Sequence, residues 1–228
     1  MRAAALCLAA AALAGCTDDT DPPWQLDHDR IIAVRATPPR VAAGEQAVVD
    51  GLVGFKGAPA LERAPDEVTV VSPAALAAAV GHDGARWTVT APSADQLAQA
   101  RGQLGLAGDA LVPLRIQVGY GALRATKTVW LGATAANPAM TSIEIDRATA
   151  TAPAVVVAAL RDIPLSIALD DQRYDVTWLS SCGTMHDFDL PSAYLRVEAD
   201  DPMAGQLALV VRDSDGGVSW RIWPIEAR

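Results

Sequence analysis

Apolar side chains recur at every second position in many short segments of this chain, and residues that favour turns separate most of these segments. A period of two places alternate side chains on opposite faces of a β-strand, so that one face is buried. The pattern predicts an all-β fold. The strands expected in the first half are 30–36, 47–53, 68–71, 87–90, 111–118 and 127–131, and those in the second half are 142–146, 164–169, 174–179, 194–198, 206–212 and 218–225.

Two segments of the first half interrupt this pattern because they are rich in alanine and leucine. They are residues 73–80 and 94–106. Ser93 is a suitable N-cap for the second segment, and Gly105 or Gly108 is a suitable stop. We therefore expect short helices inserted between the strands of the first half.

The segment 134–140 contains Asn137 and Pro138 and separates the two series of expected strands. We predict one domain over residues 30–133 and a second over residues 140–228. We also expect the second domain to fold alone, because its strands suffice to enclose a core and the separating segment has little to bury.

The second half resembles an immunoglobulin-like domain at two places. Asp175-Val176-Thr177-Trp178 resembles strand C, in which a tryptophan fills the space between two sheets, and residues 210–218 resemble the F–G hairpin of bacterial Ig-like or PKD-like modules. Residues 30–36 and 47–53 look like opening strands A and B. The resemblance implies two tandem immunoglobulin-like β-sandwich domains, the first with short inserted helices. Such modules usually serve as spacers or adhesive units.

The first residues have the pattern of a secretory leader: Arg2 precedes a short apolar run, and small residues follow. Leu13-Ala14-Gly15-Cys16 resembles the lipobox of bacterial lipoproteins, which are cut before the cysteine after its thiol receives lipid. The resemblance implies a lipoprotein signal peptide over 1–15 and a lipidated flexible tether over 16–29. Thr17, in place of aspartate, favours the outer membrane under the usual bacterial sorting rule. An ordinary secretory leader is the alternative.

The charge of the chain argues against nucleic acid as a partner. Loss of residues 1–15 removes one of 18 basic residues and none of 27 acidic ones, so the net charge changes from −9 to about −10. Affinity for polyphosphates requires clustered basic side chains, which this chain lacks. The partners we expect are the membrane, through lipid on Cys16, and an envelope glycan or protein.

Cys182 and His186 are the strongest candidates for catalysis, with Asp187 or Asp189 to orient the imidazole. A loop that follows a buried strand is the competing interpretation. The chain contains no nucleophile elbow, phosphate loop, dinucleotide fingerprint or paired cysteine motif. We therefore predict that the protein is not an enzyme and uses no cofactor, with a hydrolase or thiol enzyme as the alternative.

Asp213 and Asp215 precede Gly216 in a pattern that is similar to the start of a calcium loop. The later acidic ligands of such a loop are missing, so a solvated hairpin is the competing interpretation. A calcium-stabilised adhesive module is a further alternative function.

Six tryptophans against two phenylalanines is an unusual aromatic balance, and an exposed tryptophan can bind a sugar ring or a partner protein. Alternation turns Trp130 outward in its strand, and it places Trp223 on the opposite face from Val218, Trp220 and Ile222. Trp130 and Trp223 are therefore the candidate surface-binding residues. The function predicted is a lipid-anchored cell-envelope protein that acts as a structural spacer or as a binding or adhesion module.

Overall fold

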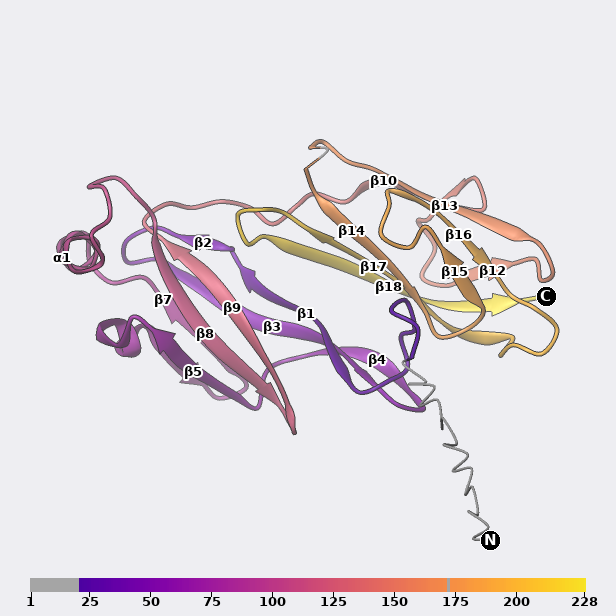
Figure 1. Ribbon diagram of the computed structural model, residues 1–228, viewed down its shortest axis with the longest axis horizontal. Coiled ribbons are helices and arrows are strands. Elements are labelled where there is room, and N and C mark those ends of the chain that lie inside the picture. Colours follow the sequence, from indigo (N-terminus) through magenta and orange to yellow (C-terminus); the bar gives the residue numbers. More distant parts are fainter. Residues whose placement is uncertain (1–20, 172) are drawn as a thin grey trace, which may run out of the picture.

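The computed structural model describes residues 21–171 and 173–228, so the expected signal peptide over 1–15 and the expected lipid site on Cys16 lie outside the described residues. Two β-sandwiches lie end to end along the long axis (Figure 1). The chain passes once through the first sandwich, from β1 to β9, and then through the second, from β10 to β18.

The first sandwich has the strand order of an immunoglobulin domain. One sheet contains strands A, B, E and D, and the other contains A′, G, F and C, with a parallel pair between A′ and G. The alternating apolar side chains of both sheets face a common core. Strands A, B, E and D are β1 (Arg30–Thr37), β3 (Gln46–Phe55), β7 (Arg86–Thr90) and β6 (Val80–Asp83), and β4 (Ala58–Arg63) also pairs with β3. Strands A′, G, F and C are β2 (Arg40–Val41), β9 (Leu123–Leu131), β8 (Val112–Tyr120) and β5 (Glu67–Ser72).

Both helices expected in the first half are present. The 3-10 helix η1 (Ala74–Ala79) follows β5, and α1 (Ala94–Leu104) follows β7. Ser93 and Gln96 form a capping box, in which the Ser93 hydroxyl accepts from the Gln96 amide and the Gln96 side chain accepts from the Ser93 amide. Gly105 ends α1 in a left-handed conformation with φ of 65°. Local caps at both ends thus define α1 inside an otherwise β fold.

The second sandwich repeats the same strand order, again with a parallel pair beside strand G. Trp178 lies in strand C between the sheets and has no exposed surface, as the sequence predicts. In spatial order, one sheet contains the short edge strand β11 (Ala148–Thr149), β10 (Thr141–Ile145), β13 (Asp162–Ala168), β16 (Ser192–Arg196) and β15 (Thr184–His186). The other contains β12 (Val155–Val157), β18 (Val218–Ala227), β17 (Ala204–Arg212) and β14 (Asp175–Ser180).

A third apolar core joins the two sandwiches. It forms where the outer face of β14, β17 and β18 packs against β1, β3 and β4 of the first sandwich. We call it the junction core, and it consists of Leu26, Ile32, Ala33, Leu52, Ala60, Leu179, Ala208, Val210, Val218 and Trp220. Without the first sandwich, the junction-core side chains of the second sandwich, which are Leu179, Ala208, Val210, Val218 and Trp220, would be exposed to water. The junction core therefore argues against the expectation that residues 140–228 fold alone.

Hydrogen bonds cross the junction on both sides of its core. Gln206 pairs with the backbone of Ala60 in both directions, at 2.7 and 3.1 Å. Asn137, in the segment between the sandwiches, donates to the carbonyl of Ala36 at 3.1 Å and accepts from the amide of Val218 at 2.8 Å. The connecting segment is therefore part of the junction and does not act as a free linker.

Residues 21–29, which we call the stem, fix the beginning of the described chain to this junction (Figure 1). Gln25 forms a parallel bridge with Ser180 at the end of β14, and Leu26 lies in the junction core with no exposed surface. A Cβ atom on Gly54 would lie 2.5 Å from the Leu26 carbonyl oxygen, so only glycine allows the stem this close to β3. Part of the segment expected as flexible tether, 16–29, is thus folded.

Within the described part of the chain, none of the helices has the length and apolar character that crossing a membrane requires.

Candidate functional site

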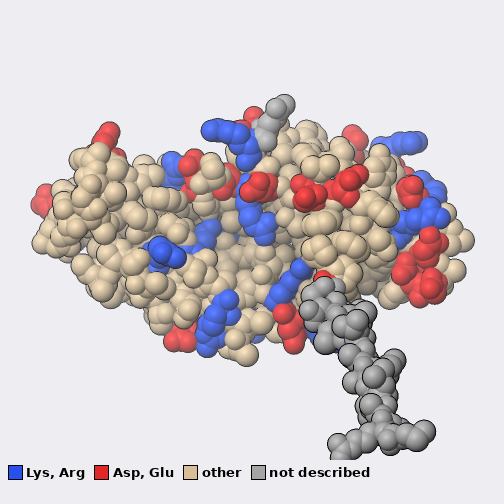
Figure 2. Space-filling model, viewed as in Figure 1, with Lys and Arg blue, Asp and Glu red and all other residues tan. Residues whose placement is uncertain are grey.

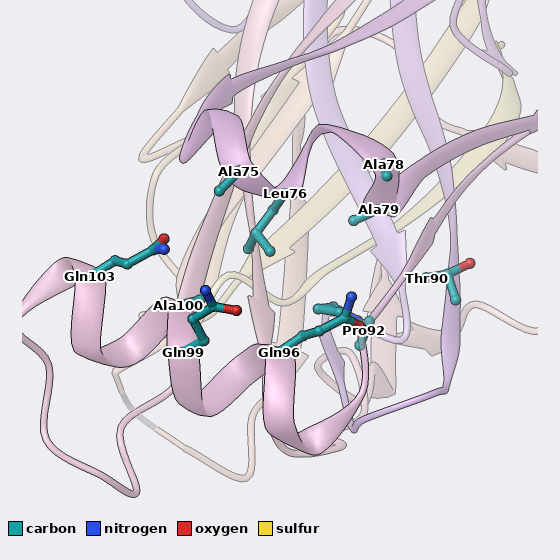
Figure 3. A pocket seen from close by; sticks show the side chains of 11 residues that line it. Ala75, Leu76, Ala78, Ala79, Thr90, Pro92, Gln96, Gln99, Ala100 and Gln103 are labelled. Atoms are coloured by element: carbon teal, nitrogen blue, oxygen red, sulfur yellow. The ribbon is translucent and has the colours of Figure 1, made fainter.

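A groove of about 450 Å³ lies between η1 and α1, at the end of the first sandwich that faces away from the second (Figures 1 and 3). This volume falls in the range that small-ligand sites occupy, roughly 300 to 1,000 Å³. Leu76 points from η1 toward α1 and forms part of the wall (Figure 3). Five of the 11 lining residues are alanine, so the groove exists because short side chains leave the space between the two helices unfilled.

Three glutamines line one wall of this groove. Gln96, Gln99 and Gln103 extend from successive turns of α1 (Figure 3). The Gln96 side-chain oxygen is used in the helix cap, whereas the Gln99 and Gln103 amides have no hydrogen-bond partner among the described residues. None of the lining residues is charged or aromatic. The groove therefore offers neutral donors and acceptors over an apolar floor.

The structure separates the two halves of the proposed thiol site. Cys182 is a free cysteine, 2% exposed, in the core of the second sandwich, and burial raises the pKa of its thiol. His186 is exposed on β15, opposite Tyr194 of β16. No hydrogen bond among the described residues joins Cys182 to His186. A nucleophilic thiol needs access and a depressed pKa, so the burial of Cys182 disfavours the thiol-enzyme alternative.

Asp213 and Asp215 close the turn between β17 and β18. One carboxylate oxygen of Asp213 accepts from the amides of Asp215 and Gly217 at 2.8 and 2.7 Å, and Asp215 forms an ion pair with Arg40 across the junction. Over residues 21–171 and 173–228, no three His, Cys, Asp or Glu side chains are grouped so that they could hold a metal ion. The geometry fits the hairpin interpretation of these aspartates.

The prediction that Trp223 is exposed is wrong, because this side chain has no exposed surface and lies in the core of the second sandwich. Trp220, on the opposite face of β18, lies in the junction core. Trp130 does point away from the first core, as alternation predicts, but the β17–β18 turn partly covers it: a Cβ atom on Gly216 would lie 3.4 Å from its ring. Trp220 and Trp223 thus pack the molecule internally, whereas Trp130 is half-buried.

No family model and no curated protein matches the chain. Among solved structures, a nucleoside hydrolase-related hypothetical protein from Saccharophagus degradans is 13% identical, with 41% of this chain and 26% of that chain covered and a TM-score of 0.32. Extracellular domains 3–5 of Drosophila OTK are 10% identical, with 87% and 63% covered and a TM-score of 0.32. Tandem Ig repeats of Dlar are 11% identical, with 86% and 97% covered and a TM-score of 0.30.

The sequence contained a signal for the groove that alternation alone does not reveal. Gln96, Gln99 and Gln103 follow the spacing of one helix face, next to alanines at helical positions. The burial of Lys127 could also have been predicted from the sequence. In β9, Lys127 is two and four residues before Val129 and Leu131, which face inward, so alternation places it on the same face. A lysine at an inward position indicates a buried charge that the fold must accommodate.

Lys127 is 7% exposed and lies at the junction of the sandwiches, where its ammonium group donates to the Gly216 carbonyl. Burial lowers its pKa to about 8, with Asp213 raising it and Arg212 lowering it. In the unfolded chain a lysine keeps its proton up to a pH of roughly 10.4. Between pH 8 and 10 the unfolded state therefore binds more protons than the folded state, and the free energy of unfolding should rise with pH.

The Lys127→Met variant should lose this rise, because a thioether of similar shape carries no proton. Below pH 8 the buried charge lowers the free energy of unfolding by its full cost, on the order of 3 kcal/mol. The variant should regain part of this free energy, reduced by the loss of the hydrogen bond to Gly216. Urea melts at pH 7 and 9.5 measure the difference. Lys56, which is exposed, provides the matched Lys56→Met control. An equal pH dependence in both variants would refute this assignment.

Proposed function

We propose that this chain is a lipid-anchored binding module of the bacterial cell envelope, attached to the membrane through Cys16 and carrying its binding surface on the two-sandwich body. Thr17 favours the outer membrane. The observation that carries the proposal is the docked stem: Leu26 is fully buried between the sandwiches, so the anchor would hold the body at its middle. The net negative charge of the chain disfavours nucleic acid as a partner.

A tether attached at the middle favours a binding role over a spacer role. Only residues 17–20 separate the lipidated Cys16 from the stem, and the five Cα–Cα steps from Cys16 to Asp21 span at most about 18 Å. The middle of the body would therefore stay close to the bilayer, while both ends remain free. A spacer requires its anchor at one end and its load at the other. The groove between η1 and α1 lies at one of the free ends (Figure 1).

Membrane fractionation of a bacterium that expresses the chain tests the anchor. The wild-type protein should sediment with the membrane, and its N-terminal peptide should carry acyl chains on Cys16, since two or three acyl chains hold a protein durably where one holds it reversibly. Cys16→Ser should be released, whereas Cys182→Ser should stay membrane-bound. If Cys16→Ser stayed in the membrane with its leader processed at the same bond, the proposed lipid anchor would be wrong.

A further inference from the structure

We infer that the groove between η1 and α1 binds an uncharged, extended peptide segment with small side chains. This inference rests on the proposed binding function and names the class of ligand. Its first support is the position of the groove, which lies at the end of the first sandwich farthest from the junction (Figure 1). In Figure 1 this end lies away from the second sandwich and from the stem.

The polar groups of the groove match the hydrogen-bonding groups of a peptide backbone. A carboxamide has one carbonyl acceptor and two N–H donors, so it can pair with both groups of a peptide bond. Gln99 and Gln103 have carboxamides that are not engaged within the described residues, and Gln96 retains its amide donors because only its oxygen is used in the cap. The three side chains point along one side of the groove (Figure 3).

The length of the glutamine row fits a short extended segment. From Gln96 to Gln103 the helix rises about 10 Å, at 1.5 Å per residue. An extended peptide rises about 3.3 Å per residue, so three to four residues span the same length. The opposite wall consists of Leu76 and alanines, including Ala75 and Ala78. This wall leaves room for small side chains and contributes apolar contact.

The composition of the groove selects against charged ligands and against sugars. A carboxylate or an ammonium group would lose water without gaining an opposite charge, because no lining residue is ionisable. Figure 2 shows that this end of the molecule carries few charged side chains on the visible face. Sugar rings are commonly bound on an aromatic face, and no lining residue supplies one.

Titration of the purified full-length chain with a capped, uncharged tetrapeptide tests the inference. The probe is acetyl-Ala-Val-Ala-Ala-amide, and the readout is the ¹⁵N resonances of the glutamine side-chain amides. The resonances of Gln99 and Gln103 should shift, and that of the exposed Gln117 on β8 should not. Acetyl-Glu-Val-Glu-Ala-amide should bind about tenfold more weakly or not at all, because its carboxylates find no partner.

Variants separate binding in the groove from binding elsewhere. Gln99→Ala with Gln103→Ala should weaken the uncharged peptide about tenfold, while α1 is retained because alanine favours helix. Ala78→Leu should weaken binding by filling the groove. Gln117→Ala is the matched control and should bind normally. Circular dichroism verifies that each variant is folded.

Three results would overturn the inference: no shift with the peptide, equal binding by all variants, or groove binding by maltotetraose in preference to the peptide. Because binding is measured on purified protein, its outcome does not depend on the lipid. A chain that binds the peptide but carries no lipid would contradict only the proposed anchor. A lipidated chain that fails to bind would contradict only this inference.

Discussion

Replacing Trp223 by alanine should lower the free energy of unfolding by about 3 to 5 kcal/mol, as much as replacing Trp178. Both indole rings are fully buried in the core of the second sandwich, and truncation leaves a cavity between its sheets. A loss of this size is a large part of the 5 to 15 kcal/mol that holds a typical domain. Urea denaturation at equilibrium measures it.

Two further variants identify the source of the loss. The Trp223 indole N–H is buried and has no hydrogen-bond partner among the described residues, so Trp223→Phe should cost much less than Trp223→Ala. Tyr194→Ala on β16 is the exposed aromatic control: Tyr194 is 44% exposed, and its loss should change stability by about 0.5 kcal/mol or less. A small loss for Trp223→Ala would place its ring outside the core and contradict the packing of β18.

The second large effect is expected at the junction core, where Val210→Asp should cost more than about 4 kcal/mol. Val210 has no exposed surface and packs between the sandwiches, so an aspartate there would be a buried charge without a partner. The cores within each sandwich do not contain Val210. We therefore expect the variant to loosen the junction and to unfold at a markedly lower urea concentration, as followed by near-ultraviolet circular dichroism and tryptophan fluorescence.

The same substitution at an exposed valine provides the control. Val156 lies in β12 of the same sheet and is 58% exposed, so Val156→Asp should be nearly neutral. If Val210→Asp proves too disruptive to fold, Val210→Ala should still lower the stability by a cavity effect. Equal effects of Val210→Asp and Val156→Asp would contradict the burial of the junction.

The sequence predicts the sandwiches well because each expected strand buries at least one face. It predicts the inserted helix α1 because Ser93 and Gly105 provide local caps, and both are used as expected. Alternation fails at β17 and β18, where the junction covers a second face. Residues 207–211 are apolar without interruption and all buried, which is the signature of a strand enclosed on both faces.

The error at Trp223 has the same physical cause. Along β18 the even-numbered positions from Val218 to Trp220 face the junction core, and the odd-numbered positions from Trp223 onward face the core of the sandwich. One strand thus buries opposite faces at its two ends. If one buried face is assumed for the whole strand, Trp220 is assigned to the core of the sandwich and Trp223 to the surface. The structure instead places Trp223 in the core of the sandwich and Trp220 in the junction core. The surface against which β17 and β18 pack comes from β1, β3 and β4. The local sequence of β17 and β18 does not identify this surface.

Scanning calorimetry of the purified chain tests most directly whether the two sandwiches and the stem form one body. The junction core and the hydrogen bonds around it predict a single transition, in which the calorimetric enthalpy equals the van't Hoff enthalpy. Two separate transitions, or a calorimetric enthalpy about twice the van't Hoff value, would show that the sandwiches unfold independently and would contradict this account.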